Sequence, residues 1–243
     1  MRVALYHDPR LNNAVLLQSL MDHFGTEAIV KVEADDIKAG ILDDSISAFF
    51  MPGGADRYYA ELLNGEGNAA LHTYVKSGGS YVGICAGAYY ACRALFWREG
   101  QADEISGPRE LGFFKGSAHG PIPEWTLGKA DCALAEVAGP LGQASLYYWG
   151  GPLFKGDLQD VDVLARYTAL PDQPAAILKG RFGKGQWLLS SAHAEYSGAA
   201  LRNSVSANDP FHTQKIEIAQ QLEAVDPARA LFWQKLLEVA TSR

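Results

Sequence analysis

The chain has few of the residues that mark several classes of protein. Its 243 residues include only three cysteines, Cys85, Cys92 and Cys132, and no CxxC pair. The sequence therefore indicates neither a disulfide framework nor a zinc–thiolate site. Basic residues are outnumbered, because 21 Lys and Arg stand against 28 Asp and Glu, for a net charge of −7. This balance disfavours nucleic acid and acidic membrane surfaces as partners.

Long apolar stretches are missing as well. No run of about 18 apolar residues occurs, as a membrane-spanning helix would need, and residues 1–10 begin with a strand pattern instead of an apolar signal region. We therefore expect no membrane association and a cytoplasmic location. With 48% hydrophobic residues and 11 prolines, the chain can build an ordinary globular core. We expect one domain over residues 1–243, with its core in about residues 1–200 and closing helices over 209–243.

The first half of the chain alternates short apolar runs with helical patterns, which is typical of a parallel βαβ sheet. Strands are expected at residues 2–6, 26–32, 46–51 and 80–84. Helices are expected from Asn12 or Asn13 to Phe24, from Asp56 through Leu63, over 68–77 and over 85–93. Residues 95–170 are less regular and predict only loops and short strands, at 95–97, 112–115, 146–149 and 161–167.

A hairpin and two helices are expected in the last third. Residues 175–182 and 186–192 are apolar runs joined by Gly183-Lys184-Gly185, which predicts a β-hairpin. Asp209-Pro210 and Asp226-Pro227 each have the residues that favour a helix start, so we expect two separate helices. The second carries an apolar stripe that would pack on the body of the domain or, alternatively, form a dimer contact.

Cys85 is the strongest candidate for a reactive residue. It is the centre of Gly83-Ile84-Cys85-Ala86-Gly87, between a predicted strand and a predicted helix, which is the context of a nucleophile elbow. The glycines leave room for a sharp turn, and the helix N-terminus favours a thiolate. A lone cysteine would be interpreted as a small buried apolar residue. The paired glycines favour the functional interpretation instead.

A base and an acid for this nucleophile follow the predicted hairpin. His193 and Glu195 are two residues apart, so on a strand they point to the same face, and Glu195 could fix the tautomer of His193. The same pattern would suit a solvated strand end or a pair of metal ligands. No third ligand occurs at a recognisable spacing, so we expect no metal.

An oxyanion hole requires backbone N–H groups beside the nucleophile. The Ala86 N–H is one candidate because the elbow turns it toward the site. A glycine N–H of Gly53 or Gly54, at the end of the neighbouring predicted strand, is the other. Without the elbow, these two glycines would indicate only a flexible turn.

Two further segments have weaker functional interpretations. The segment Tyr147-Tyr148-Trp149-Gly150-Gly151-Pro152 could be a substrate platform, but the pattern alone favours core packing. Residues 179–185 look superficially like a phosphate-binding loop, but the flanking strands favour a hairpin turn. Cys92 and Cys132 have no evident partner and are expected to be structural.

Four segments together resemble the class I glutamine amidotransferase-like superfamily. They are MPGGAD (51–56), GICAGAYYA (83–91), YYWGGP (147–152) and GKGQWLLSSAHAE (183–195). Within it, the chain is most similar to the domain at the N-terminus of eukaryotic biotin protein ligases, which also occurs as stand-alone bacterial proteins. The resemblance implies an α/β fold with a flavodoxin-like parallel sheet flanked by helices, an inserted β and loop region, and C-terminal helices.

The resemblance also implies roles for particular residues. Cys85 would be the nucleophile, His193 the base and Glu195 its orienting acid, with Gly54 and Ala86 forming the oxyanion hole. It further raises Tyr148, Gly150 and Gly151 as a loop near the site.

Two departures from the superfamily pattern bear on the activity. The bulky residue and Gly-His-Gln that follow the nucleophile of its glutaminases are replaced by Ala86-Gly87-Ala88-Tyr89, which weakens the case for glutamine as substrate. Ala194 stands where the H-P-E pattern has proline, which loosens the backbone between base and acid. The glycine- and arginine-rich adenylate signature of a biotin ligase is missing, so no ligase activity is expected from this chain alone.

We therefore expect a cysteine-dependent hydrolase or amidotransferase-like enzyme acting on a small amide or acyl compound, without a cofactor. A homodimer or a partner enzyme is left open. The alternative from another class is a catalytically silent ligand-binding or regulatory module of the same fold. A third hypothesis keeps the nucleophile but takes the acid from the end of the first strand, around His7 and Asp8.

Overall fold

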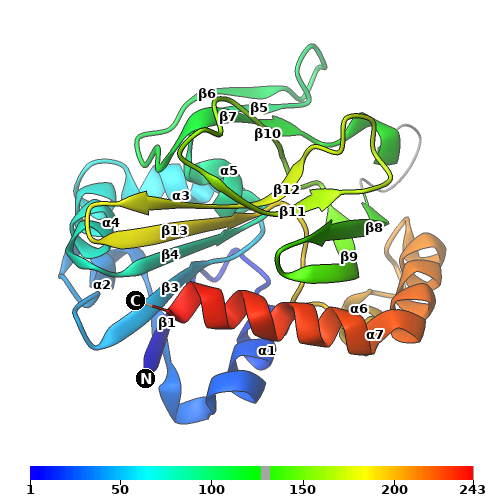
Figure 1. Cartoon of the computed structure of the whole chain (residues 1–243), viewed down its shortest axis with the longest axis horizontal. Coiled ribbons are helices and arrows are strands. Elements are labelled where there is room, and N and C mark those ends of the chain that lie inside the picture. The colour runs from blue at the N-terminus through cyan, green and yellow to red at the C-terminus, as the bar shows by residue number, and fades with distance from the viewer. Residues whose placement is uncertain (127–131, 243) are drawn as a thin grey trace.

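The computed structural model describes residues 1–126 and 132–242, which form two β-sheets, with helices packed on the larger one (Figure 1). The larger sheet has nine strands in the order β2-β1-β3-β4-β13-β12-β11-β8-β9. The smaller has four, in the order β10-β7-β5-β6. The larger sheet changes from parallel to antiparallel pairing at β13 and thus has a parallel half and an antiparallel half.

The parallel half is built from apolar runs whose ends meet at one edge. β1 pairs with β2 and β3, and β4 pairs with β3 and β13, all in parallel. The strands are β1 (Arg2–Tyr6), β2 (Ile29–Val32), β3 (Ile46–Met51), β4 (Ser80–Ile84) and β13 (Gly185–Ser190). Because β3 and β4 are buried along almost their whole length, they need helices on both faces.

Helices cover both faces of this parallel half. Successive strand residues point to opposite faces, so Phe49 packs with the helices of one face and Phe50 with those of the other. The first group is α2 (Ala34–Lys38), α3 (Asp56–Leu63), α4 (Glu66–Ser77) and α5 (Ala86–Tyr90). The second is α1 (Ala14–Phe24) and α7 (His212–Thr241).

The antiparallel half and the smaller sheet come from the less regular middle of the chain. The antiparallel strands are β12 (Ala175–Phe182), β11 (Asp162–Tyr167), β8 (Cys132–Gly139) and β9 (Gly142–Trp149). The smaller sheet contains β5 (Cys92–Trp97), β6 (Ile105–Pro108), β7 (Phe114–Gly120) and β10 (Leu153–Lys155). Short 3-10 turns lie at η1 (Thr26–Ala28) and η2 (Pro123–Trp125). The predicted α/β class, with a parallel sheet flanked by helices and an inserted β region, is confirmed.

Two predicted elements of the first half are shorter than expected. The strand predicted from residue 26 starts only at Ile29, because Thr26–Ala28 form a 3-10 turn after Gly25 ends α1. The helix predicted over 85–93 ends at Tyr90, and Cys92 already begins β5. Cys92 pairs in parallel with Phe114 of β7, so this distant pairing ends the helix early.

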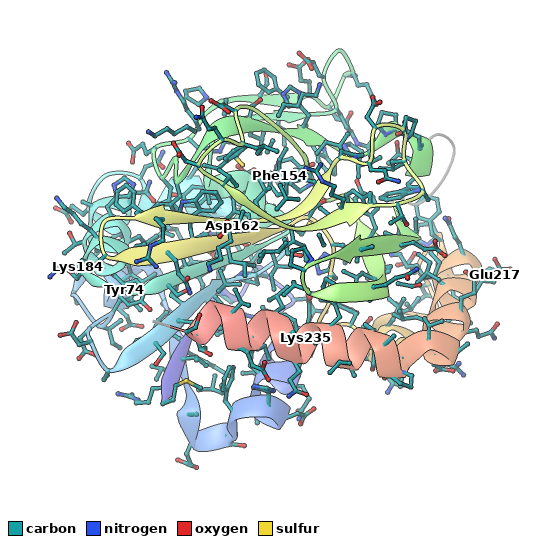
Figure 2. All side chains as sticks on the ribbon, in the orientation of Figure 1. Tyr74, Phe154, Asp162, Lys184, Glu217 and Lys235 are labelled. Atoms are coloured by element: carbon teal, nitrogen blue, oxygen red, sulfur yellow. The ribbon has the colours of Figure 1, made fainter. Side chains whose placement is uncertain are left out.

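The prediction of two closing helices is wrong. Asp209-Pro210 does precede α7, which starts at His212, but Asp226-Pro227 lies inside that same helix. Figure 1 shows α7 changing direction between its orange and red parts, and Figure 2 labels Glu217 on the first part and Lys235 on the second. A proline in a helix removes one hydrogen bond and bends the axis, while buried residues on both sides keep the helix going.

Two smaller features complete the C-terminal region. A further helix, α6 (Gly198–Ser204), begins at Ser197, whose side chain accepts a hydrogen bond from the Ala200 N–H. In the second part of α7, Phe232 and Leu236 are buried against the sheet, as the apolar stripe predicts. None of the described helices combines the length and apolarity needed to cross a membrane.

Candidate active site

Cys85 stands at the sharp turn between β4 and α5. Its backbone has φ 50° and ψ −106°, a conformation that costs free energy for a residue with a side chain. The Cys85 N–H donates to Ser190 O at 2.8 Å, which ties the turn to β13. A Cβ at Gly83 would lie 2.5 Å from Gly87 O, and a Cβ at Gly87 would overlap Met51 O. Both glycines of the predicted elbow are therefore needed for its close packing.

The start of α5 leaves the Ala86 N–H free to bind a ligand. The Gly87 N–H donates to Pro52 O at 3.1 Å, and the Ala88 N–H donates to Cys85 O at 2.9 Å. Among the described residues, no backbone carbonyl accepts the N–H of Ala86 or of Gly54. An unused N–H at the first turn of a helix is suited to hold a negative oxygen.

The turn that carries Gly53 and Gly54 lies directly beside the elbow. A Cβ at Gly53 would lie 3.5 Å from Cys85 Cβ, and the Gly87 N–H donates to Pro52 O, so the turn and the elbow are neighbours. The Tyr59 O–H donates to Pro52 O at 2.8 Å and to Gly53 O at 3.2 Å, which fixes the turn. Gly54 has φ 136°, which favours glycine there.

His193 and Glu195 follow β13 and reach the same place. The His193 N–H donates to Tyr147 O at 2.7 Å, which ties this segment to β9. His193 Nδ1 lies 2.7 Å from Glu195 Oε1, and both residues are buried. A Cβ at Gly53 would lie 2.9 Å from His193 Cε1. The imidazole and the Cys85 side chain therefore both lie next to the position that a side chain on Gly53 would occupy.

The surroundings of His193 favour its charged form. Burial alone would lower its pKa, but the charge of Glu195 and the neighbouring Cys85 outweigh burial and raise the pKa of His193 to about 10. The Cys85 thiol donates to Trp149 O at 3.3 Å. Among the described atoms, none forms a hydrogen bond with His193 Nε2, which is buried. Nε2 is thus the ring atom that remains available for proton exchange.

Arg229 of α7 holds the backbone between His193 and Glu195. Its Nη1 donates to Ala194 O at 2.7 Å, and its Nε donates to Asp226 Oδ1 at 2.7 Å. A proline at position 194 would restrain this backbone through its ring. In this chain a buried guanidinium restrains it through a charge-assisted hydrogen bond.

A pocket of about 480 Å³ opens in front of these groups. Among the predicted site residues, those that line it are Gly53, Gly54, Cys85, Ala86, Gly150, His193 and Glu195. Apolar side chains that the sequence did not single out also line it, namely Leu16, Leu95, Trp97 and Ile105. In the part of the chain that the structure describes, no group of three His, Cys, Asp or Glu side chains could hold a metal ion.

Two residues of the predicted aromatic loop are placed behind the pocket lining. Tyr148 is fully buried, its O–H donates to Gly151 O at 2.8 Å, and it accepts from the Ile122 N–H at 2.7 Å. Tyr148 and Gly151 therefore shape the loop, while Trp149 and Gly150 line the pocket.

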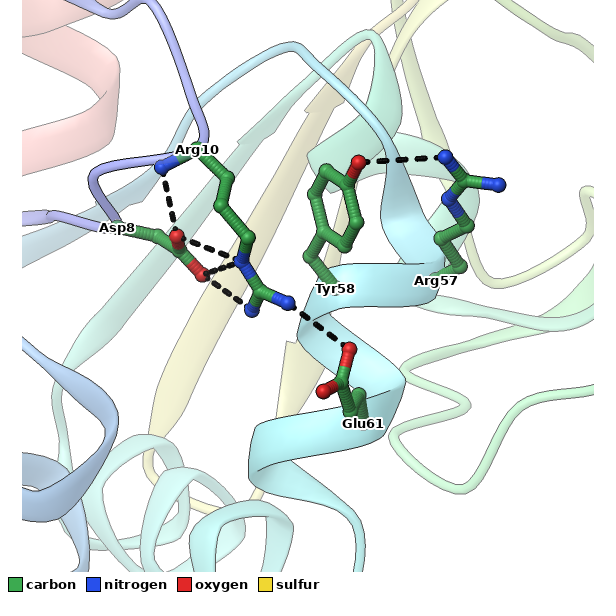
Figure 3. A network of polar contacts seen from close by, with 5 residues as sticks. All are labelled: Asp8, Arg10, Arg57, Tyr58 and Glu61. Atoms are coloured by element: carbon green, nitrogen blue, oxygen red, sulfur yellow. Dashed lines mark hydrogen bonds and ion pairs between the residues drawn. The ribbon is translucent and has the colours of Figure 1, made fainter.

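Three further candidates do not line this pocket: Asp8, residues 179–185 and Cys92. Arg10 binds both oxygens of Asp8, which lowers the pKa of that carboxyl (Figure 3), and Asp8 does not line the pocket. Residues 179–185 form the end of β12 and its turn into β13, as predicted. Burial raises the pKa of the Cys92 thiol, which donates to Ala88 O at 3.2 Å.

The sequence of the chain matches a known protein family. The profile of the family described as "Biotin-protein ligase, N terminal" matches residues 10–241. The chain belongs to this family. The match confirms the resemblance expected from the four sequence segments.

Two curated relatives of this family member are known by sequence. An uncharacterized protein of Chlamydia muridarum is 36% identical over 162 residues, which are 63% of this chain and 62% of the relative. A biotin–protein ligase of Schizosaccharomyces pombe is 32% identical over 177 residues, which are 68% of this chain and 28% of the relative. The matches thus span less than two thirds of the length of each relative.

Two solved glutamine amidotransferases are similar to this chain in fold. One has a TM-score of 0.58 at 21% identity, covering 90% of this chain and 99% of its own. The other, from Thermotoga maritima, has a TM-score of 0.59 at 11% identity and covers 100% of both chains. At such identities the likeness concerns the fold alone.

Sequence reasoning missed several residues around the site of this biotin-protein ligase N-terminal family member. Trp97 and Ile105 reach the pocket from the smaller sheet, and Arg57 reaches it from the first turn of α3. Arg229 acts through its hydrogen bond to Ala194 O, which lies 35 residues earlier in the chain. No local pattern marks any of them. The one available signal was the aromatic segment that ends in Trp149, because Trp149 is exposed and lines the pocket.

Proposed function

We propose that this protein is a cysteine-dependent hydrolase or amidotransferase-like enzyme that cleaves an amide or related acyl compound through a thioester at Cys85. One observation carries the proposal: Cys85 sits on a strained strand-to-helix turn beside His193, and Glu195 lies 2.7 Å from His193 Nδ1. A nucleophile, a base and an orienting acid in this order are what covalent acyl transfer requires.

In the first half of the reaction, His193 Nε2 holds the proton that it has taken from the Cys85 thiol, and the resulting thiolate bonds to the carbonyl carbon. The carbonyl oxygen becomes an oxyanion, which the N–H groups of Ala86 and Gly54 would bind. The C–N bond then breaks, His193 gives its proton to the nitrogen, and the amine leaves. Glu195 stabilises the imidazolium between these two transfers.

In the second half, a water molecule gives a proton to His193 and its oxygen bonds to the thioester carbon. The C–S bond breaks, the proton returns to the sulfur of Cys85, and a carboxylic acid leaves. An amine in place of water would give a new amide instead, which is the transfer reaction. The charge of Glu195 favours both halves because each one passes through a protonated His193.

Acetyl transfer from p-nitrophenyl acetate tests this proposal without knowledge of the natural substrate. We expect a burst of about one p-nitrophenol per chain and one acetyl group on Cys85 by peptide mass spectrometry. Cys85→Ala should abolish both signals, and Cys92→Ala is the matched control that should keep them. Acetylation of the wild-type chain that does not reach Cys85 would overturn the proposal.

A catalytically silent module of the same fold is the rival hypothesis. It predicts no thioester at Cys85 in that experiment. It also predicts that Cys85→Ser keeps the affinity for any ligand and the associated phenotype, whereas an enzyme would lose turnover.

A further inference from the structure

We propose that the pocket beside Cys85 accepts amides that have a flat apolar part and a negatively charged group, and that it rejects amides that carry an ammonium group, glutamine included. This inference rests on the proposed function and names the substrate class for it. It depends on three features of the pocket: an aromatic wall, acidic residues that are already paired, and one unpaired arginine.

The aromatic wall lies next to the nucleophile. The Cys85 thiol donates to Trp149 O at 3.3 Å, and the next residue, Gly150, lies next to the ring of Trp97. A Cβ at Gly150 would be 2.9 Å from Trp97 Cη2, and Tyr89 meets that ring edge-on with a centroid distance of 5.9 Å. The indole of Trp97 is therefore held against the loop that the sulfur contacts.

Exposed apolar side chains extend this wall. Trp149 is 45% exposed and Ile105 is 36% exposed, and both line the pocket together with Trp97. Apolar rings in a concave site gain free energy when a flat apolar group covers them. The wall therefore favours a substrate with a ring or a similar flat apolar part.

The acidic residues of the pocket already have positive partners. Within the described lining, the acids are Asp56 and Glu195. Asp56 Oδ2 is 2.6 Å from the guanidinium of Arg109, and Glu195 Oε1 is 2.7 Å from His193, while Glu195 Oε2 is buried and has no described hydrogen-bond partner. Because each carboxylate already has a positive partner, the ammonium of glutamine would gain less from it than it loses by leaving water.

Arg57 leaves a positive charge at the pocket. Figure 3 shows its guanidinium donating to Tyr58 O–H at 3.2 Å, while Arg10 lies over the Tyr58 ring at 4.2 Å and binds Asp8 and Glu61. Arg10 is thus fully paired with carboxylates. No described carboxylate forms an ion pair with Arg57, which lines the pocket. A carboxylate or phosphate on the substrate would form an ion pair with the Arg57 guanidinium.

Alkylation of Cys85 by three electrophiles tests the inference on the full-length chain. The probes are iodoacetamide, 4-(iodoacetamido)benzoate and the zwitterionic glutamine mimic 6-diazo-5-oxonorleucine, with labelling followed by mass spectrometry. Each rate at Cys85 is divided by the rate of the same probe with N-acetylcysteine, which removes intrinsic reactivity. We expect the benzoate to exceed iodoacetamide by about tenfold, as covering one ring and pairing one charge would give, and the glutamine mimic to fall below it.

Variants assign this selectivity to particular side chains. Trp97→Ala should reduce the ratio of benzoate to iodoacetamide labelling about tenfold, Trp97→Phe should restore most of it, and Arg57→Gln should reduce it about threefold. Arg181→Gln, on the distant hairpin, is the matched charge control and should leave the ratio unchanged. Thermal unfolding of each variant shows whether it is folded.

The outcomes separate this inference from the function on which it rests. If iodoacetamide itself labels Cys85 no faster than it labels N-acetylcysteine at neutral pH, the proposed function fails. If Cys85 is highly reactive but the glutamine mimic labels it as fast as the benzoate does, the substrate class is wrong while the function stands. If the ratio of benzoate to iodoacetamide labelling is unchanged in folded Trp97→Ala and Arg57→Gln, the proposed substrate class is also wrong.

Discussion

The two halves of the nine-stranded sheet contribute different kinds of residue to the pocket. The parallel half brings Cys85, Gly53 and His193, each at or just beyond the end of a strand. The antiparallel half, with the smaller sheet joined to it, brings Trp149 and Trp97. The parallel half therefore supplies the reactive groups, and the antiparallel half supplies apolar side chains that line the pocket.

The two halves also fix their residues in different ways. Backbone hydrogen bonds hold the reactive residues, such as Cys85 N–H to Ser190 O and His193 N–H to Tyr147 O. Ring packing holds Trp97, through Tyr89 and the bare backbone of Gly150. Changes in the parallel half should therefore alter reactivity toward every probe, and changes in the antiparallel half should mainly alter the preference among probes.

The largest effect is expected from Gly87→Ala in the elbow. The added Cβ would overlap Met51 O, a backbone atom that cannot move without shifting β3. We expect a loss of about 3 kcal/mol or more in the free energy of unfolding, measured by urea denaturation. Gly25→Ala is the control, because it meets no atom within 4 Å and differs only in its φ of 85°, so about 1 kcal/mol is expected.

Glu195→Gln should lower the alkylation rate of Cys85 by iodoacetamide about 100-fold at pH 7. The reason is that the amide no longer stabilises the imidazolium that forms when His193 accepts the thiol proton. Glu61→Gln, an exposed carboxylate that pairs with Arg10, is the matched control and should change the rate by less than about twofold. Equal rates in both variants would argue for an acid other than Glu195.

The pH dependence of stability gives a second readout of Glu195→Gln. In the wild type, the pKa of His193 is raised from 6.5 to about 10, so the stability that its protonation supplies is complete below pH 6.5 and lost as pH rises through 10. Urea midpoints should therefore fall between pH 6.5 and 10 in the wild type. In Glu195→Gln this decline should shrink, because burial then dominates the pKa of His193. A decline of the same size in both chains would contradict the assigned contact.

Arg229→Met should lower the alkylation rate of Cys85 about tenfold, because the Ala194 carbonyl between base and acid loses its restraint. A purely structural role would lower stability and leave the pH profile of alkylation unchanged. If Arg229 positions the base and the acid, Arg229→Met shifts the pH profile of alkylation, and Arg229→Lys should restore part of the wild-type profile. Arg202→Met, which breaks an exposed pair with Glu223, serves as the control.

The smallest effect is expected in the antiparallel half, from Trp149→Leu. Trp149 is 45% exposed, and its main-chain oxygen, which a substitution keeps, makes the contact with Cys85. We expect the ratio of benzoate to iodoacetamide labelling to fall about threefold. If Trp149→Leu lowers the iodoacetamide rate by a larger factor than it lowers this ratio, the antiparallel half affects reactivity more than preference. That result would contradict the distinction between the two halves.

The same division explains how much the sequence could predict. Strands at 46–51 and 80–84, the elbow and the hairpin after residue 175 are encoded by local patterns, and the structure has them. These patterns also located Gly53, His193 and Glu195, which lie around Cys85. Local periodicity is enough there because buried parallel strands are continuous apolar runs that end in glycine turns.

The features that the sequence did not predict depend on contacts between distant segments. Trp97 reaches the pocket because β5 pairs with β7, which the irregular pattern of residues 95–170 does not reveal. Pro227 looked like a helix start because a proline at the first turn and one inside a bent helix have the same local sequence. The family resemblance raised Tyr148 as a residue near the site, whereas the residue pattern favoured core packing; its side chain is fully buried, donates to Gly151 O and does not line the pocket.

The central claim is that His193 and Glu195 activate Cys85, and one measurement tests it most directly. This is the rate at which iodoacetamide alkylates Cys85 at pH 6, relative to N-acetylcysteine, in the wild type and in Glu195→Gln. We predict that wild-type Cys85 reacts at least about 100-fold faster than the free thiol and that Glu195→Gln removes most of this advantage. A wild-type rate equal to that of the free thiol, or an advantage that survives in folded Glu195→Gln, would contradict the claim.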